Sequence, residues 1–339
     1  MTIIYRLILI IIKAYHKMTV FSFLIFLYLH VFSVVSFTDK RVIVLGIDGF
    51  LSKCFVPDKY TGFSWLLNNG SYTFKARTSV YSISAPGWSN ILCAQSSEET
   101  GITDNDWWAP WVNKQPYHVT PVTGNNTPLP CIFQTIKENN NNLKNAAIFT
   151  WDWLLNFGNE AIPNSIDKEF ICKSTSVFEA ITCDEKAYNN SIELIKSKDF
   201  DFLFIDLNSL DSAGHTYNFC SEEYVKVIGT LDKYLQGVIS EMESSGILNS
   251  TYLIVTSDHG ASNNTLYHGL DKDDDNLLVP WIMTGPNIKK GYMIEGNIKN
   301  ADTSPTVIYS LGLNQNSFWR AYPVMEVFEE DHGKRFLNN

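Results

Sequence analysis

The stretch Thr251-Tyr-Leu-Ile-Val-Thr-Ser-Asp258-His259-Gly260 decides the fold, because an apolar run there ends in a carboxylate, an imidazole and a glycine. Runs rich in β-branched residues are typical of strands that are buried on both faces of a parallel sheet. In open α/β sheets, ligands bind at the carboxyl ends of the strands. The pattern therefore predicts that Asp258 and His259 bind a metal there, although the pair alone is equally typical of an ordinary polar exit from a strand.

A second apolar run, Phe202–Ile205, leads into the segment Asp211-Ser-Ala-Gly-His215. Two side chains four residues apart on a helical turn share one face, so Asp211 and His215 can bind the same ion. Asp206 is the competing ligand, but it lacks this spacing relative to His215. The third histidine in this half of the chain, His268, is a further candidate.

Two more candidates lie near the start of the folded region. The apolar run Arg41–Ile47 predicts a buried strand with Asp48 at its end, where an Asp-Gly turn alone would also account for an aspartate. Ser84 precedes Pro86 at the predicted start of a helix, where the free N–H groups and the dipole of the first turn stabilise negative charge. A structural N-cap, worth about 1 kcal/mol, is the alternative role for Ser84. Ser82 or Ser89 could instead take the structural role, and Ser82 is the alternative nucleophile.

The candidates share one placement, because each falls where a predicted strand or helix start meets a loop. They are Asp48, Ser84, Asp211, His215, Asp258, His259 and His268. Carboxylates are hard ligands and imidazoles are borderline ones, and this mixture suits zinc. The sequence therefore predicts a centre for two Zn²⁺ ions at the C-terminal ends of the strands, with other divalent metals as alternatives.

The order of these motifs resembles the alkaline phosphatase superfamily and, within it, the type I phosphodiesterase/nucleotide pyrophosphatase branch, across roughly residues 40 to 330. This resemblance implies an α/β fold with a mostly parallel central sheet flanked by helices on both faces. It implies that Ser84 is the nucleophile and that Asn105 holds a phosphoryl oxygen. It also implies one zinc held by Asp48, Asp258, His259 and the Ser84 oxygen, and a second held by Asp211, His215 and His268.

Several positions depart from the pattern of that branch. Ser84 stands where the pyrophosphatases have threonine, Trp88 replaces a polar residue, and Thr100 replaces a histidine. His268 also follows His259 unusually soon, as in some ethanolamine-phosphate transferases of the superfamily. These differences leave the substrate open and do not affect the predicted metal ligands.

Two cations that flank a transferring group can stabilise both the entering and the leaving oxygen of an in-line displacement. We therefore expect a zinc-dependent phosphodiesterase or nucleotide pyrophosphatase, which acts on small-molecule phosphate esters or nucleotides through a phosphoserine at Ser84. A phosphomonoesterase, a phosphoryl or phosphoethanolamine transferase, and an inactive secreted binding protein are the alternatives. A sulfatase is disfavoured, because Trp88 follows Ser84-Ala-Pro-Gly where the sulfatase modification motif has arginine.

The residues near the predicted site favour diesters and pyrophosphates over monoesters. A monoester dianion exposes three charged oxygens, for which a bidentate arginine is the usual additional ligand. Of the arginines, only Arg77 lies near a motif. Tryptophans could instead form a flat apolar wall for an ester group or a base, unless they are core residues; the candidates are Trp88, Trp107, Trp108 and Trp151.

The composition limits the class of protein. The 339 residues are 45% hydrophobic and 18% charged, which fits a folded domain, and we assign residues 38–339 to a single catalytic domain. The formal net charge of −10 argues against nucleic acid as a partner, because such proteins need clustered Lys and Arg.

Residues 1–37 form a separate segment, in which Arg6, Lys13 and Lys17 precede the apolar run Met18–Phe37. Such a run is typical of a secretory signal peptide, and it is also long enough for an uncleaved N-terminal anchor. We therefore expect a secreted, extracellular or lumenal protein. If the segment stays uncleaved, the protein would be anchored in a membrane through this segment alone.

The cysteines and glycosylation motifs fit the same compartment. The six cysteines form an even number, and Cys172 with Cys183 is the predicted pair, whereas Cys93 lies in an apolar helix pattern and could simply be buried. Acceptor motifs for N-glycosylation begin at Asn69, Asn125, Asn189, Asn249 and Asn263.

Overall fold

The apolar runs of the sequence form the centre of an eight-stranded mixed sheet. The computed structural model of the chain describes residues 40–106, 130–159, 161–269 and 273–329. The strands lie in the order β4-β3-β5-β1-β6-β7-β2-β8, and only β7 runs antiparallel to its neighbours β6 and β2. Their bounds are β1 Arg41–Ile47, β2 Gly70–Arg77, β3 Asn145–Phe149, β4 Lys168–Ile171, β5 Phe202–Leu207, β6 Thr251–Thr256, β7 Leu278–Thr284 and β8 Tyr292–Met293.

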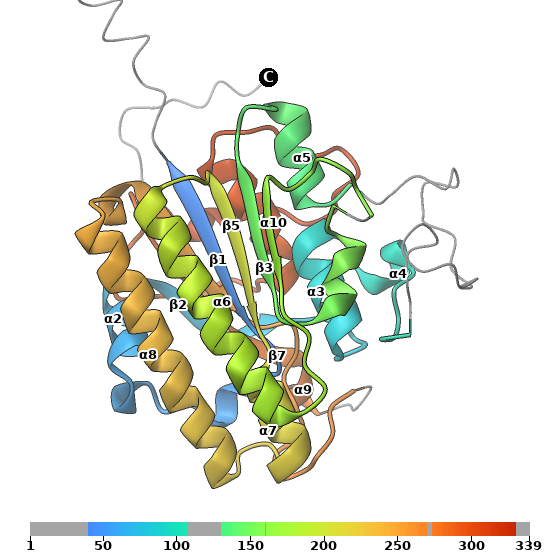
Figure 1. The fold of residues 1–339 in the computed structure, drawn as a ribbon. Helices are drawn as coiled ribbons and strands as arrows, with labels where there is room; N and C mark the ends of the chain where they lie inside the picture. Colours follow the sequence, from blue (N-terminus) through green and yellow to red (C-terminus); the bar gives the residue numbers. More distant parts are fainter. Residues whose placement is uncertain (1–39, 107–129, 160, 270–272, 330–339) are drawn as a thin grey trace, which may run out of the picture. The chain divides into compact units, whose positions relative to one another are not determined.

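Helices cover both faces of this sheet (Figure 1). Helices α2 (Thr61–Asn69), α6 (Val177–Ser197) and α8 (Glu222–Ser244) pack on one face. Helices α3 (Ser84–Cys93), α5 (Ile132–Asn139) and α10 (Thr303–Ser310) pack on the other. The short helices are α4 (Ser97–Thr100), α7 (Ser209–Tyr217) and α9 (Asp274–Leu277), and the 3₁₀ turns are η1 (Ser52–Cys54), η2 (Pro57–Lys59), η3 (Asp152–Asn156), η4 (Leu248–Ser250), η5 (Asn300–Asp302) and η6 (Met325–Val327).

The predicted fold class, a mostly parallel sheet between two layers of helices, is therefore confirmed. Strand β1 shows the reason, because its successive side chains alternate between the two cores. Val42 and Val44 belong to the core beneath α3, whereas Ile43 and Leu45 belong to the core beneath α8. A strand buried on both faces has no polar position, which is why the sequence shows an unbroken apolar run.

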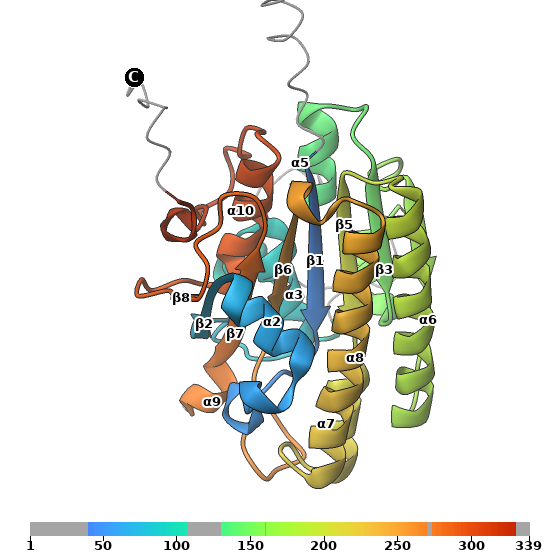
Figure 2. The same ribbon diagram turned by 90° about the vertical axis from the view of Figure 1, so that its left-hand side faces the viewer.

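The carboxyl ends of three neighbouring strands converge at one edge of the sheet. Strand β1 lies between β5 and β6, and Gly46 pairs with Asp206 on one side and with Thr256 on the other. The backbone N–H of Asp48 donates a hydrogen bond of 2.9 Å to the Leu207 carbonyl. Figure 2 shows β1 pointing toward the end where α7 and α9 lie. The segments that follow these strands therefore meet.

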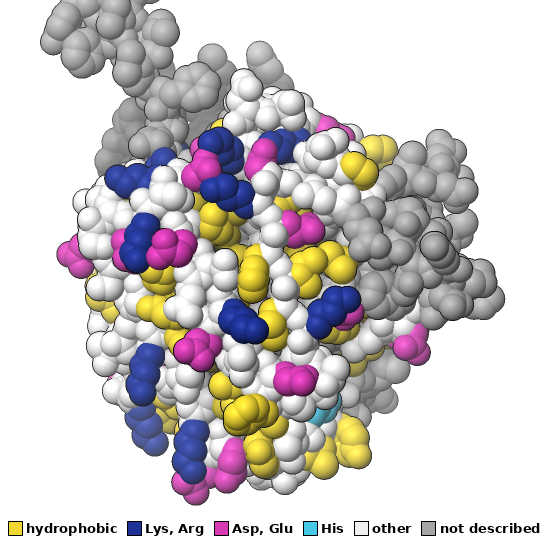
Figure 3. Space-filling model, viewed as in Figure 1, with side chains coloured by type: hydrophobic (Ala, Val, Ile, Leu, Met, Phe, Trp, Pro, Cys, Tyr) yellow, Lys and Arg dark blue, Asp and Glu magenta, His cyan; other side chains and the backbone are white. Residues whose placement is uncertain are grey.

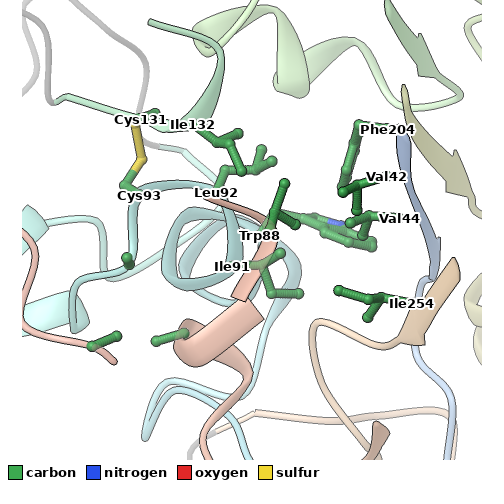
Figure 4. Packing of buried hydrophobic residues seen from close by; sticks show 14 of the residues in the cluster. Val42, Val44, Trp88, Ile91, Leu92, Cys93, Cys131, Ile132, Phe204 and Ile254 are labelled. Carbon is green, nitrogen blue, oxygen red and sulfur yellow. A yellow bond between two sulfur atoms is a disulfide. The ribbon is translucent and has the colours of Figure 1, made fainter. Parts of the chain in front are cut away.

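Helix α3 approaches the sheet closely because one large side chain fills the space between them. Trp88 is fully buried, and its ring meets Phe204 edge to face at a centroid distance of 5.7 Å. In Figure 4 the Trp88 ring lies between α3 and the β1 residues Val42 and Val44. A side chain at Gly46 would come within 2.3 Å of this ring, so glycine is required opposite the tryptophan.

Three disulfides are present in the described part of the chain. The predicted pair Cys172–Cys183 is present, and the expectation that Cys93 is merely buried is wrong, because Cys93 bonds with Cys131 (Figure 4). The third bond joins Cys54 and Cys220 across 166 residues. It connects the segment that follows Asp48 to the segment that follows α7.

Two expectations concern residues that the structure does not describe. The N-terminal segment 1–37 lies outside the described ranges, and so do Trp107 and Trp108. Within the described ranges, no helix has the length and apolar character needed to cross a membrane. The assignment of residues 38–339 to one catalytic domain stays a prediction.

The close approach of α3 to β6 yields a test of packing. A Cβ on Gly87 would lie 2.3 Å from the Asp258 carbonyl oxygen, whereas a Cβ on Gly229 in α8 would meet only the Tyr60 ring at 4.0 Å. We expect Gly87→Ala to lower the free energy of unfolding by about 1–3 kcal/mol. Gly229→Ala should raise it by about 0.5–1 kcal/mol, because alanine favours the helix. Urea unfolding of both variants measures this, and equal stabilisation by both substitutions would contradict the packing described.

Candidate metal centre

Three side chains that follow β1 and β6 form the first cluster. Asp48, Asp258 and His259 are completely buried, and each can direct one ligand atom to a common point, with these atoms within 4.8 Å of one another. The His259 Nε2 atom lies 3.2 Å from Asp48 Oδ1 and 3.4 Å from Asp258 Oδ2. Residues separated by more than 200 positions therefore meet because β1 and β6 are neighbours in the sheet.

A second cluster combines α7 with the loop that follows β6. Asp211 and His215 lie four residues apart on α7, and His215 Nε2 is 3.3 Å from Asp211 Oδ2. His268 comes from the loop, with its Nε2 3.5 Å from Asp211 Oδ1 and 3.0 Å from His215 Nε2. The spacing that predicted a shared helical face for Asp211 and His215 therefore brings them together, whereas Asp206 is in neither cluster.

The two clusters adjoin each other and form one centre. The rings of His259 and His268 are stacked with centroids 3.8 Å apart. His259 Nε2 also lies 4.0 Å from Asp211 Oδ1. All six charged or imidazole residues predicted as ligands are thus gathered in one place, at the predicted ends of the strands.

Backbone carbonyls orient the three imidazoles. His215 Nδ1 lies 2.7 Å from the Leu266 carbonyl, His259 Nδ1 lies 2.7 Å from that of Gly260, and His268 Nδ1 lies 2.9 Å from that of Ser82. A carbonyl oxygen can only accept, so each Nδ1 must donate its hydrogen. The Nε2 atom of each neutral ring therefore turns a lone pair toward the centre, which is the usual arrangement of metal-binding histidines.

Each carboxylate of the centre is held by one oxygen and leaves the other without a hydrogen bond. Asp48 Oδ2 accepts from the Trp88 indole N–H at 3.1 Å, and Asp258 Oδ1 accepts from the Gly49 backbone at 3.2 Å. On the three carboxylates of the centre, the buried oxygens without a hydrogen-bond partner are Asp48 Oδ1, Asp211 Oδ1 and Asp258 Oδ2. Buried acceptors of this kind are costly unless a cation or a donor satisfies them.

The pKa values of these groups also indicate that the centre lacks positive charge. Burial and the Asp211 charge raise the pKa of Asp48 to about 8, and burial and the Asp48 charge raise that of Asp258 well above its ordinary value. Burial lowers the pKa of His268 to about 4, whereas its hydrogen bond with Asp211 raises that of His215 to about 9. The carboxylates can ionise together only if positive charge is placed among them. The two clusters therefore fit divalent cations in their donor atoms and in their charge.

Ser84 lies beside the first cluster as the first residue of α3. Its Oγ is 3.1 Å from His259 Nε2, and its side chain is buried but faces a cavity. Ile83, not Ser84, occupies the N-cap position, so the structural role considered for Ser84 is wrong. Ser82 has the structural role, because its buried hydroxyl donates to the Asn276 carbonyl.

Asn105 pairs with one of the backbone N–H groups in the first turn of α3. Its Oδ1 accepts the backbone N–H of Ala85 at 2.8 Å, while proline has no N–H at Pro86 and the Gly87 N–H donates to the Ile83 carbonyl. The expectation of several free N–H groups at this helix start is therefore wrong. Asn105 itself lines the same cavity as Ser84.

The cavity above the centre has a volume of about 330 Å³. His215 is 43% exposed there, whereas His259 and His268 are buried. A histidine side chain is visible at the surface in Figure 3, near the end where α6 and α7 meet. The other lining residues are Ser84, Asn105, Trp151, Ser174, Thr175, Ser176, Val177, Asn208, Asp211, Ser212, Thr216 and His268.

The tryptophans have different roles from those expected as a group. The prediction that Trp88 forms part of an apolar wall is wrong, because its ring is buried and its indole N–H donates to Asp48. Trp151 does line the cavity, and its ring stacks on the buried Trp153 with centroids 5.1 Å apart. Of the candidates within the described ranges, only Trp151 can contact a substrate.

Two buried aspartates support the centre from behind, and their role was not predicted. Asp184 of α6 accepts the backbone N–H groups of Asn208 and Ser209 at 2.9 and 3.0 Å, which fixes the start of α7. Asp206 accepts the Thr150 N–H at 3.0 Å and so fixes the segment that carries Trp151. Burial raises the pKa of each carboxyl to about 7.

The cavity wall at the start of α6 was also missed, although a signal for it exists in the sequence. Ser176 caps α6 by accepting the N–H of Glu179, three residues later. Serine followed by glutamate at this spacing marks a helix start. The signal locates the helix, but it does not show that the helix start faces the centre.

Known proteins resemble this chain in sequence and in fold. The family model of type I phosphodiesterases/nucleotide pyrophosphatases matches residues 42–301. Among solved structures, murine ectonucleotide pyrophosphatase/phosphodiesterase 5, an inactive variant in complex with AMP, has a TM-score of 0.62. It is 17% identical in sequence, over 86% of this chain and 100% of that chain. At this identity the likeness shows the fold alone.

Two curated relatives have other activities in their names. Arylsulfatase K from Xenopus laevis is 24% identical over 133 residues, which are 39% of this chain and 23% of that protein. GPI ethanolamine phosphate transferase 1 from Aspergillus fumigatus is 28% identical over 163 residues, which are 42% of this chain and 16% of that protein. The match thus spans less than a quarter of either relative.

Proposed function

Because the chain belongs to the type I phosphodiesterase/nucleotide pyrophosphatase family, we propose that it is a secreted, zinc-dependent phosphodiesterase or nucleotide pyrophosphatase that acts through a phosphoserine. One observation carries the proposal: the Ser84 hydroxyl lies 3.1 Å from His259 at the floor of an open cavity, beside two clusters of metal-binding type. A buried nucleophile beside a site for positive charge is suited to attack on a phosphoryl group.

The six residues of the clusters would hold two ions. Asp48, Asp258 and His259 would hold one, and Asp211, His215 and His268 would hold the other. When bound, divalent cations supply positive charge that neutralises phosphoryl oxygens and the charge developing in the transition state. Zinc is the ion that this mixture of carboxylate and imidazole donors suits best.

The residues of the chain have distinct tasks in the reaction. Ser84 Oγ forms a bond to phosphorus while the bond to the leaving alcohol or phosphate breaks, and water then cleaves the phosphoserine. Asn105 lines the cavity and accepts the Ala85 N–H with its amide oxygen, so its amide nitrogen can donate to a phosphoryl oxygen. The rigid Asp48–Trp88 hydrogen bond keeps the floor of the centre in position during both steps.

A transferase of the same superfamily is the second candidate. The short interval between His259 and His268 resembles some ethanolamine-phosphate transferases, and one of these is among the relatives above. Such an enzyme would share Ser84 and the clusters and differ in passing the group to an alcohol. Product analysis with glycerol added as acceptor separates the two, because a transferase would form the glycerol ester in preference to free product.

Secretion is supported by the disulfides. Each of the six cysteines is bonded, which suits an oxidising compartment. Residues 1–37 would then act as the signal peptide or, if uncleaved, as an anchor.

Metal content is the first test of the proposal. Elemental analysis of the purified protein is expected to find two zinc ions per chain, because two adjoining clusters are present. Treatment with EDTA should abolish hydrolysis, and added zinc should restore it. Full activity in EDTA, with no transition metal bound, would contradict the assignment.

The role of Ser84 is tested by comparison with Ser82. Ser84→Ala is expected to lower kcat by at least about a thousandfold while most of the zinc stays bound, because six side-chain ligands remain. Ser82→Ala is the matched control, because the Ser82 hydroxyl donates to the Asn276 carbonyl and does not face the cavity. This substitution should leave turnover within about tenfold of the native value. Retained activity in Ser84→Ala would exclude the phosphoserine mechanism.

The preference for diesters is tested with two model substrates. We expect a higher kcat/KM for bis(p-nitrophenyl) phosphate than for p-nitrophenyl phosphate, because Trp151 offers a flat face to a second ester group. Trp151→Ala should lower kcat/KM for the diester by roughly tenfold, as expected for lost stacking, and change the monoester less. A clear preference of the native protein for the monoester would make it a phosphatase.

A further inference from the structure

A second cavity lies at the C-terminal end of α3 and shares no lining residue with the cavity above the metal centre. Its volume is about 270 Å³, against about 330 Å³ for the cavity above the centre. It is bounded by the end of β2, the C-terminal end of α3, helix α4 and the 3₁₀ turn η5. We call it the α4 cavity.

Positive charge is in excess at this cavity, because Arg77, Lys299 and Arg320 line it against two carboxylates, Glu98 and Glu99. Arg77 and Lys299 are neighbours across a parallel bridge, and both line the α4 cavity. Neither forms an ion pair with another residue in the described ranges. A third cation, Arg320, is 71% exposed and lies 3.5 Å from Glu99. In a chain with a net charge of −10, this local excess of positive charge favours an anionic ligand.

The floor of the α4 cavity is polar and suited to hydroxyl groups. The buried side chains that line it include Asn90, Gln95 and Asn300. Asn300 is completely buried, and its Oδ1 accepts no hydrogen bond from the described residues. A buried acceptor without a donor is costly, and a hydroxyl of a ligand would satisfy it.

We propose that the α4 cavity is a second binding site, which takes a small anion carrying hydroxyl groups, such as a sugar acid or a sugar phosphate. Arg77 and Lys299 bind the anionic group, because charge-assisted hydrogen bonds are the stronger ones. The amide side chains of the floor bind the hydroxyls. The site shares no lining residue with the cavity that holds Ser84, so the inference goes beyond the proposed function.

The floor of the α4 cavity also contacts the metal centre. The Asn300 Nδ2 atom donates to Thr78 Oγ1 at 2.7 Å and to the Asp258 carbonyl at 3.3 Å. The Thr78 hydroxyl donates to the same carbonyl. A ligand that binds Asn300 therefore acts on the hydrogen bonds that hold the backbone of a candidate metal ligand. Occupancy of the cavity should change turnover without contact with the substrate.

The binding test uses D-glucuronate, which carries a carboxylate and hydroxyls but is no phosphate ester and cannot be turned over at Ser84. Calorimetry on the metal-loaded protein is expected to detect glucuronate and to find D-glucose, its uncharged match, bound at least roughly tenfold more weakly. The double variant Arg77→Gln/Lys299→Gln should weaken glucuronate binding by at least roughly tenfold. The double variant Lys226→Gln/Lys233→Gln on α8 removes the same charge elsewhere and should leave binding unchanged.

The activity test follows hydrolysis of bis(p-nitrophenyl) phosphate with and without saturating glucuronate. We expect the rate to change at least about twofold in the native protein and in the α8 control, and not in the Arg77→Gln/Lys299→Gln variant. Absence of glucuronate binding, or binding that the cavity variant retains, overturns the site. Binding without any change in rate overturns the connection through Asp258. Because calorimetry needs no turnover, failure of the proposed hydrolysis would not be mistaken for failure of the second site.

Discussion

The structure depends on one electrostatic constraint: three carboxylates and three imidazoles are packed into a buried centre that their own charges cannot balance. Asp48 and Asp258 have no solvent exposure, and each leaves one oxygen without a hydrogen bond. In a low dielectric, such carboxylates either keep protons or require cations. The raised pKa values of Asp48 and Asp258 describe the first condition, and bound divalent ions would provide the second. The fold around the centre holds these groups together against their repulsion.

Several contacts outside the centre provide that restraint. The Trp88 indole fixes one oxygen of Asp48, and the absence of a side chain at Gly87 lets α3 reach the Asp258 backbone. On the opposite side, Asp184 fixes the start of α7 and so the position of Asp211. The Cys54–Cys220 disulfide joins the two segments that carry the clusters, and a bond across 166 residues removes much of the freedom of the unfolded chain. Each of these contacts helps to hold a charged group of the centre in place against repulsion by its neighbours of like charge.

The parts of the fold and centre that could be predicted from the sequence are those with local patterns. The unbroken apolar runs identified β1, β5 and β6, and polar residues after such runs indicated where ligands gather. The four-residue spacing of Asp211 and His215 is likewise local. Strand β2 was not predicted, because its alternating pattern resembles that of many exposed segments. Trp88 was misread as a substrate contact, because only the packing of α3 against the sheet makes it a core residue.

The distribution of cations explains why the sequence alone left the substrate open. Arg77 stands close to Ser84 in the sequence, which made it the one arginine available for a phosphoryl group. In the structure it lines the α4 cavity, and no arginine of the described ranges lines the cavity above the metal centre. The proposed phosphoryl site would therefore rely on the clusters and on neutral groups such as Asn105. A site without a fixed guanidinium is better matched to the single charge of a diester than to the dianion of a monoester. Arg77, the one arginine near a motif in the sequence, instead lines a separate cavity, and the hydrogen bonds of Thr78 and Asn300 to the Asp258 carbonyl connect that cavity to the centre.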